Sequence, residues 1–316
     1  MNTANDIVHS PINGGAFLPT GDEQPPMEGP LVPTGITSLD NQLRGGVRVG
    51  TFNVICGYTG DGKSSFVVHL AQTAAALGHP VQLYHSEMTT EEYLQRLKSW
   101  ESGVAYAKIR GVVPVDFPLI EVLSLRSGGN AGVQDIVANI SPLKTAHKNK
   151  PVVIVDSMDG IESGRKQLEE IAQSLASMAG QEDALVWATS QANSRGTTVT
   201  IDNLREATGK AFPCSLLIGL GRSCPEDKGS DAVLTVDKNR YGSRFQIRTR
   251  VRWECQWFSD VDDSYLIPRV QGEPTICDPG DKSAHGESDK SAHGESDKSA
   301  HESDKSARES DKSENL

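Results

Sequence analysis

The fold is decided by one stretch of the chain, Gly57-Tyr58-Thr59-Gly60-Asp61-Gly62-Lys63-Ser64. This stretch matches the pattern G-x-x-x-x-G-K-[ST] at every fixed position. The apolar, β-rich residues 51–57 predict a strand before it, and the apolar positions repeated over 63–77 predict a helix after it. In that context the glycines turn backbone N–H groups inward, and the helix N-terminus attracts anions. We therefore predict a phosphate-binding loop, called the P-loop below.

The P-loop predicts a site for ATP and Mg²⁺. In this motif Lys63 would reach the β- and γ-phosphates, and Ser64 would bind the metal. The apolar run 151–155 ends in Asp156, a carboxylate at the end of a neighbouring parallel strand that can hold the metal through water. The predicted nucleotide-binding residues are Gly57, Tyr58, Thr59, Gly60, Asp61, Gly62, Lys63, Ser64 and Ser65.

Two further candidates follow predicted strands. Glu87 comes directly after the strand 81–86, which we expect beside the P-loop strand. Its carboxylate can orient and deprotonate the attacking water, and the alternative is that it caps the next helix. Gln191 comes after the strand 184–190, where its amide can sense the γ-phosphate or lie in an ordinary exposed loop.

The order of the elements predicts an α/β fold. Strands alternate with helices as far as residue 190, which implies a mostly parallel sheet flanked by helices and joined by right-handed crossovers. After Cys214 strands dominate, so we expect the sheet to continue with hairpins to about residue 267.

The acidic composition limits how the chain can meet nucleic acid. A net charge of -11 argues against a protein that grips phosphates with its whole surface, although a local basic site stays possible. Residues 239–253 offer one, because cations alternate there with apolar residues. This pattern is typical of a solvent-exposed strand face whose charges prevent aggregation through the sheet edge. It is also typical of a basic strip that faces a neighbouring subunit or nucleic acid. The polar positions of the strip are Arg244, Gln246, Arg248, Arg250 and Arg252.

Composition also divides the chain into three parts. Residues 1–33 lack periodicity and predict a disordered segment, residues 34–270 predict the core, and residues 271–316 form an acidic, low-complexity repeat that predicts a disordered tail. The five cysteines form no C-x-x-C pair, which is typical of reduced thiols in the cytosol. Since no apolar run is long enough to span a bilayer, we expect a cytoplasmic protein outside the membrane.

With these motifs placed, residues 34–258 resemble the DnaB-type replicative helicases within the RecA-like ATPases. Ser86-Glu87-Met88 resembles the segment that holds their catalytic glutamate. Lys238-Asn-Arg240-Tyr-Gly242 is similar to the segment whose Lys and Arg reach the nucleotide of the neighbouring subunit. Further similar segments are the lead-in 34–40, residues 189–193 around Gln191, and residues 203–206, which resemble the loop that lines the DNA channel.

The resemblance implies a RecA-like core and a Mg²⁺-dependent ATPase that acts as a DNA helicase. It would translocate on single-stranded DNA in phage- or plasmid-type replication. The resemblance also implies a homo-oligomer, namely a hexamer, and a primase or other replication proteins as partners. The residues implied in catalysis are Lys63, Glu87, Gln191, Lys238 and Arg240, and those implied in DNA binding are Arg205, Glu206 and Thr208.

Departures from the helicase pattern leave two alternatives open. Ala207-Thr208 replaces the Ser-Gly expected in the DNA loop. Asp156-Ser157 and residues 238–242 also resemble RadA-type recombination ATPases. The first alternative is therefore a recombination ATPase like RadA or RecA, and the second is an ATP-binding scaffold or regulator that does not unwind DNA.

Overall fold

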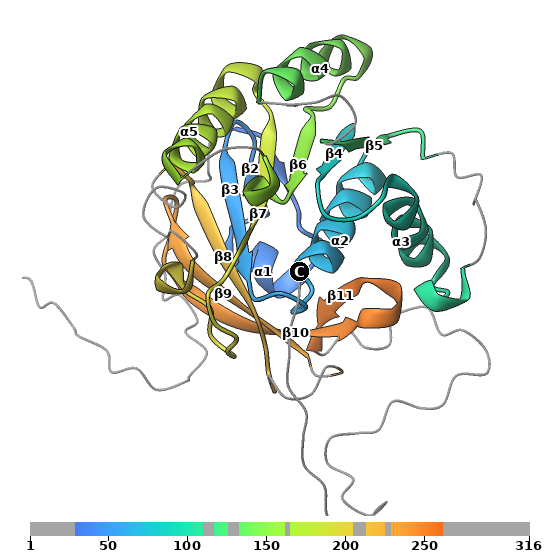
Figure 1. The fold of residues 1–316 in the computed structure, drawn as a ribbon, viewed down its shortest axis with the longest axis vertical. Helices are drawn as coiled ribbons and strands as arrows, with labels where there is room; N and C mark the ends of the chain where they lie inside the picture. Colours follow the sequence, from blue (N-terminus) through green and yellow to red (C-terminus); the bar gives the residue numbers. More distant parts are fainter. Residues whose placement is uncertain are drawn as a thin grey trace, which may run out of the picture. The chain divides into compact units, whose positions relative to one another are not determined.

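The P-loop strand β3 (Phe52–Gly57) lies inside a nine-stranded sheet in the computed structural model (Figure 1). The structure describes residues 29–109, 117–125, 133–161, 165–204, 213–224, 229 and 231–261. Within these residues the strand order is β11-β10-β9-β8-β3-β7-β6-β4-β5. The other strands are β4 (Val81–His85), β5 (Ile120–Ser124), β6 (Val152–Asp156), β7 (Leu185–Gln191), β8 (Leu216–Arg222), β9 (Ala232–Asn239), β10 (Phe245–Arg252) and β11 (Trp257–Asp260).

Neighbouring strands from β8 to β5 in this order are all parallel, whereas β9, β10 and β11 join by antiparallel pairing. The predicted α/β fold with a mostly parallel sheet is thus confirmed, as are the strands expected after Cys214. A separate two-stranded sheet pairs β1 (Leu31–Val32) with β2 (Val47–Arg48). The helices are α1 (Thr37–Gln42), α2 (Lys63–Ala76), α3 (Thr90–Ser102), α4 (Val133–Ala146) and α5 (Arg165–Glu182).

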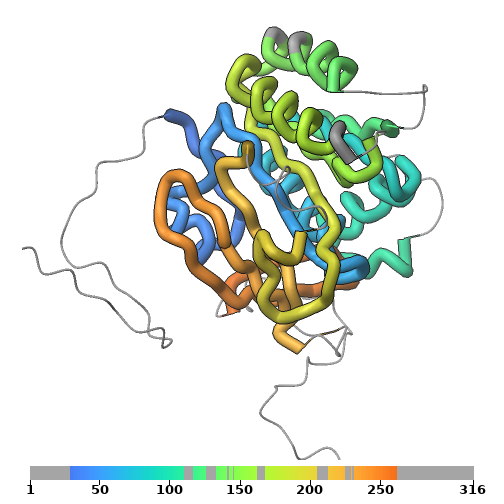
Figure 2. Tube along the Cα trace, turned by 60° about the vertical axis from the view of Figure 1, so that its left-hand side comes forward, coloured from blue at the N-terminus to red at the C-terminus, as the bar shows by residue number. Residues whose placement is uncertain are grey.

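Helices cover both faces of the sheet, as the two views in Figures 1 and 2 show. Successive residues of β3 point to opposite faces, so Ile55 packs with α2 and α3 while Val54 packs with α4 and α5. Both side chains are fully buried. This two-sided burial explains why the parallel strands read as continuous apolar runs in the sequence.

One expectation about the strand order is wrong. β4 does not lie beside β3, because β7 and β6 stand between them. The chain leaves β3 through α2, skips two positions to form β4 and β5 at the far edge, and later fills the gap with β6 and β7. Strands that follow one another along the chain are therefore not always neighbours in this sheet.

The boundary of the predicted N-terminal segment also differs. Strand β1 lies at Leu31–Val32, within the part predicted to be disordered, because Val32 is buried in the core and pairs with Val47. Strand β5 and helix α1 had no expected counterpart. Residues 1–28 of the N-terminal segment, the residues after 261, and Arg205, Glu206 and Thr208 lie outside the described residues.

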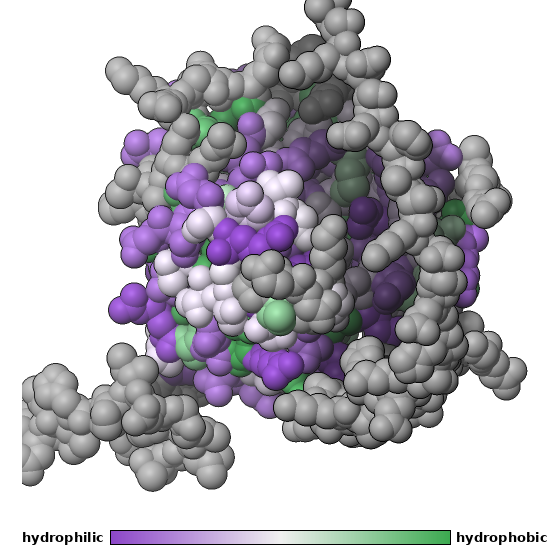
Figure 3. Space-filling view, turned by 60° about the horizontal axis from the view of Figure 1, so that its bottom comes forward, coloured by the Kyte–Doolittle hydropathy of each residue, from purple (hydrophilic) through white to green (hydrophobic). Residues whose placement is uncertain are grey.

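Figure 3 turns the lower edge of the molecule, as drawn in Figure 1, toward the reader. Hydrophilic residues predominate on the coloured part of this face, and hydrophobic residues form only small patches. The buried apolar residues lie between the helices and the sheet. Among the described residues, every helix is too short or too polar to cross a membrane.

Candidate functional site

The P-loop connects β3 to α2 as the sequence predicts. Gly60 and Gly62 adopt φ angles of 85° and 101°, in the left-handed region that favours glycine, and the helix begins at Lys63. A Cβ atom at Gly62 would collide with the ring of Trp253. The Lys63 ammonium group donates hydrogen bonds to the backbone oxygens of Gly57 at 2.9 Å and Tyr58 at 3.2 Å. The lysine thus closes the loop on itself.

Ser64 and Asp156, the two residues predicted to hold the metal, are connected through Tyr93. The hydroxyl of Tyr93, on α3, donates a hydrogen bond to the Asp156 carboxylate and also hydrogen-bonds the Ser64 side chain. Thr189 donates to the other oxygen of Asp156. Asp156 and Tyr93 are buried, and burial together with the Asp156 charge raises the pKa of Tyr93 well above its ordinary value. The sequence did not single out Tyr93, because nothing in its own helix connects it to the P-loop.

These groups fit a magnesium ion. The serine hydroxyl of Ser64 and the carboxylate of Asp156 are oxygen donors, which Mg²⁺ prefers over nitrogen or sulfur. Both reach the same hydroxyl of Tyr93 from opposite elements, so they face a common point at the end of β6 and the start of α2.

Glu87 and Gln191 also come together, although their strands are not neighbours. The Gln191 side-chain amide donates to a carboxylate oxygen of Glu87 at 3.3 Å, and the hydroxyl of Ser157 donates to the same oxygen at 3.2 Å. Glu87 is exposed, so it is open to water. Asp159 accepts the backbone N–H of Gln191 at 2.9 Å and holds the end of β7 in place. The premise that β4 adjoins β3 was wrong, yet the carboxyl ends of β4, β6 and β7 bring these side chains to one edge.

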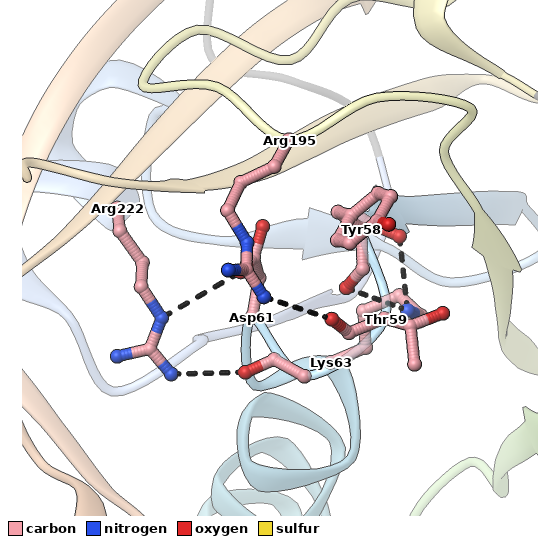
Figure 4. A network of polar contacts seen from close by, with 8 residues as sticks. Tyr58, Thr59, Asp61, Lys63, Arg195 and Arg222 are labelled. Atoms are coloured by element: carbon pink, nitrogen blue, oxygen red, sulfur yellow. Dashed lines mark hydrogen bonds and ion pairs between the residues drawn. The ribbon is translucent and has the colours of Figure 1, made fainter. Parts of the chain in front are cut away.

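Two arginines close on the P-loop from the other side (Figure 4). Arg195, in the loop after β7, lies with its Nε 3.1 Å from a carboxylate oxygen of Asp61. Arg222, at the end of β8, lies 3.7 Å from the same oxygen. Asp61 is completely buried inside the loop. The motif pattern gives no sign of either arginine, because both come from distant parts of the chain.

Lys238 and Arg240 lie at the opposite end of the sheet. β9 runs antiparallel to β8, and Asn239 at its end pairs with Leu216, four residues before the Leu220 that pairs with Gly57, so this end is about 13 Å from the P-loop level of the sheet. Arg240 is exposed, and its backbone N–H donates to Ser215 at 2.9 Å. Burial lowers the pKa of Lys238. Neither residue is brought to the P-loop of its own chain.

The basic strand is partly neutralised by its neighbour. In β10 the predicted alternation is present, with Gln246 and Arg248 exposed and Thr249 and Val251 buried. Arg248 forms an ion pair with Asp231 at 3.2 Å, and Arg244, just before the strand, pairs with Asp237 at 3.5 Å. Arg252 is buried and Trp253 lies beyond the strand, so the strip is shorter than the sequence predicts.

The comparison with known proteins agrees with this geometry. Residues 31–260 match the model of the DnaB-like helicase C-terminal domain. The chain belongs to the DnaB-like helicase family. This confirms the resemblance inferred from its motifs, and with it the RecA-like core. No curated protein matches the chain.

Two solved structures share the fold. One, described as an ATPase domain, superposes with a TM-score of 0.65 at 21% identity, over 73% of this chain and 92% of that one. A DnaB-like replicative helicase, described with its interactions with primase, superposes with a TM-score of 0.64 at 21% identity, over 72% of this chain and 61% of that one. The helicase family implies an ATPase.

Proposed function

We propose that this protein is a Mg²⁺-dependent ATPase that drives a DNA helicase along single-stranded DNA during replication. One observation carries the proposal. In a member of the DnaB-like family, the P-loop, the Ser64–Asp156 pair and the Glu87–Gln191 contact converge at the carboxyl ends of parallel strands. Ligands of open α/β sheets bind at this edge.

Each group has a distinct part in hydrolysis. Lys63 leaves the backbone oxygens of Gly57 and Tyr58 and neutralises the β- and γ-phosphates. Ser64 and Asp156 hold Mg²⁺, which supplies charge stabilisation to the phosphates when bound. Glu87 accepts a proton from the attacking water, and Gln191, which already contacts that carboxylate, orients the water and responds to the γ-phosphate.

The position of Arg240 supports a shared active site. Because Lys238 and Arg240 lie at the end of their own sheet opposite the P-loop, we infer that they complete the site of a neighbouring subunit. A ring, a hexamer, supplies such neighbours. Within it Arg205, Glu206 and Thr208 would face single-stranded DNA in the channel. Since a relative is described with primase, a primase is also a candidate partner in the cytoplasm.

The alternatives differ in what the ATPase drives. A recombination ATPase is favoured by Asp156-Ser157 and by residues 238–242, which both families share. A scaffold is the least supported, because it leaves the contact between Glu87 and Gln191 without a purpose. We propose residues 34–270 as the ATPase core, extended by strand β1 at Leu31–Val32, which packs on it.

Strand displacement on a forked duplex with ATP tests the function, alongside ATP turnover of wild type and Lys63→Ala. We expect DNA-stimulated turnover and unwinding in the wild type, and a loss of both by about 100-fold or more in the variant, as for loss of a charged group that stabilises the transition state. Equal turnover in the two proteins contradicts the ATP site. Stimulation by single-stranded DNA without unwinding favours the recombination ATPase, and no stimulation favours the scaffold.

A further inference from the structure

A buried carboxylate inside a phosphate-binding loop poses an electrostatic problem. Asp61 is fully buried between Gly60 and Gly62, the two glycines that shape the loop. Its negative charge opposes the phosphates that the loop is built to attract. Burial raises the pKa of Asp61, and the nearby charges of Arg195, Arg222 and Lys63 oppose that rise. The loop is therefore suited to phosphate only while cations balance this carboxylate.

Arg195 makes three contacts with the loop. Besides its ion pair with Asp61 at 3.1 Å, it donates a hydrogen bond to the Thr59 backbone oxygen at 3.3 Å. Its guanidinium group also lies over the ring of Tyr58, 5.1 Å from the ring centre (Figure 4). One side chain thus joins the carboxylate, a carbonyl and an aromatic ring of the same loop.

Arg222 repeats this pattern from β8. It lies 3.7 Å from Asp61, donates to the Gly60 backbone oxygen at 3.0 Å, and stacks over Trp253 at 4.1 Å. It is buried, with 6% of its surface exposed. Its longer distance to the carboxylate leaves the closer ion pair to Arg195.

The two arginines differ in what they connect. Arg222 ends a core strand, whereas Arg195 lies in a loop whose ends are tied together by the bridge between Ala192 and Leu204 and by the Asn193 N–H donating to Asn203 at 2.7 Å. Leu204 directly precedes the residues proposed to bind DNA. Besides the Ala192 N–H, which donates to the Gly57 backbone oxygen at 2.9 Å, Arg195 contacts the P-loop from this loop, at Thr59 and Asp61.

We propose that Arg195 is a positioning residue for nucleotide binding, which neutralises Asp61 and fixes the P-loop against the loop that ends at Leu204. The inference rests on the proposed ATP site. Its distinctive consequence is that Arg195 matters because Asp61 is present. An arginine that only contacted phosphate would matter equally with or without that carboxylate.

A double-mutant cycle separates these cases. We would measure the affinity of a fluorescent, non-hydrolysable ATP analogue for wild type, Arg195→Ala, Asp61→Asn and the double variant. Arg195→Ala should weaken binding about tenfold, because it leaves a buried carboxylate less compensated. In the Asp61→Asn background the same change should cost less than about threefold. Equal losses in the two backgrounds would overturn the proposal.

Arg48→Ala is the matched control. Arg48 lies over the ring of Tyr241 at 5.2 Å, the same kind of contact, but near the end of the sheet opposite the P-loop. It should bind the analogue as wild type does. Lys63→Ala separates a failure of the Arg195 proposal from a failure of the proposed ATP site. Unaltered binding of the analogue in that variant contradicts the ATP site itself. Should Asp61→Asn fail to fold, Arg195→Lys carries the test: it keeps the charge and should keep most of the affinity, and loss equal to that of Arg195→Ala refutes the proposal.

Discussion

At the scale of single residues, Tyr93 is the residue beyond the sequence motifs that matters most for the proposed metal site. Its hydroxyl joins Ser64 to Asp156, so it fixes both groups before the metal arrives. We predict that Tyr93→Phe weakens Mg²⁺ binding about tenfold, the loss typical of removing a partner that orients a metal ligand. Titrating Mg²⁺ against binding of a fluorescent nucleotide measures this without hydrolysis.

The control for Tyr93 is another buried tyrosine. Tyr84→Phe removes a hydroxyl that contacts Gln82 and Asn139, on the side of the sheet covered by α4 and α5. It should leave the Mg²⁺ titration unchanged. If Tyr93→Phe binds Mg²⁺ as tightly as wild type, or more tightly, the hydroxyl does not support the metal site.

His69 predicts how stability depends on pH. It is enclosed by Phe66, Trp100 and Phe258, and burial lowers its pKa from 6.5 to about 4. As the pH falls, His69 therefore takes up a proton in the unfolded chain before it does so in the folded chain. The free energy of unfolding has its full value above pH 6.5 and decreases as the pH drops toward 4. The loss is on the order of 3 kcal/mol.

Chemical denaturation at several pH values measures this slope. His69→Gln should flatten it between pH 6.5 and about 4, because the titrating group is gone. Phe66→Leu loosens the same cluster without removing a titrating group, and should keep the slope. An unchanged slope in His69→Gln assigns the pH dependence to other residues.

At the scale of elements, local sequence patterns predicted most of the strands and helices of the core. They did not predict how strands that are distant in the sequence pair with one another. The run 51–57, the P-loop and the helix after it were recognisable because one strand, one turn and one helix are adjacent in sequence. Thr89 caps α3 and forms a capping box with Glu92, three residues further along the chain. The order of strands was not predictable, since β4 and β3 are joined by a helix yet separated by two later strands.

The same limit applies to the site. Lys63, Ser64 and Asp156 could be predicted because each belongs to a motif that lies within a single continuous segment of the chain. Tyr93 and Arg195 do not, because their partners come from segments that only the folded sheet brings together. Glu87 was chosen with a wrong premise about its strand, and its contact with Gln191 depends on β6 and β7, whose carboxyl ends fall at the same edge.

At the scale of the whole molecule, the distance between Arg240 and the P-loop of its own chain predicts cooperation between subunits. If each site takes Arg240 from a neighbour, Arg240→Ala binds ATP but loses about 10³-fold or more in turnover, as for an arginine that acts in trans. Lys63→Ala fails for a different reason, since its own P-loop is defective while its Arg240 is intact.

Mixing the two inactive variants tests this sharing. Where a Lys63→Ala subunit presents Arg240 to the intact P-loop of an Arg240→Ala subunit, a complete site forms, so the mixture should hydrolyse ATP well above the sum of the separate rates. Mixing Lys63→Ala with Lys63→Ala/Arg240→Ala offers no intact P-loop and should stay inactive. Arg48→Ala, near the same end of the sheet, should keep wild-type turnover alone. A mixture no faster than its parts, from variants that still assemble, means that each chain completes its own site and that Arg240 has no catalytic part in trans.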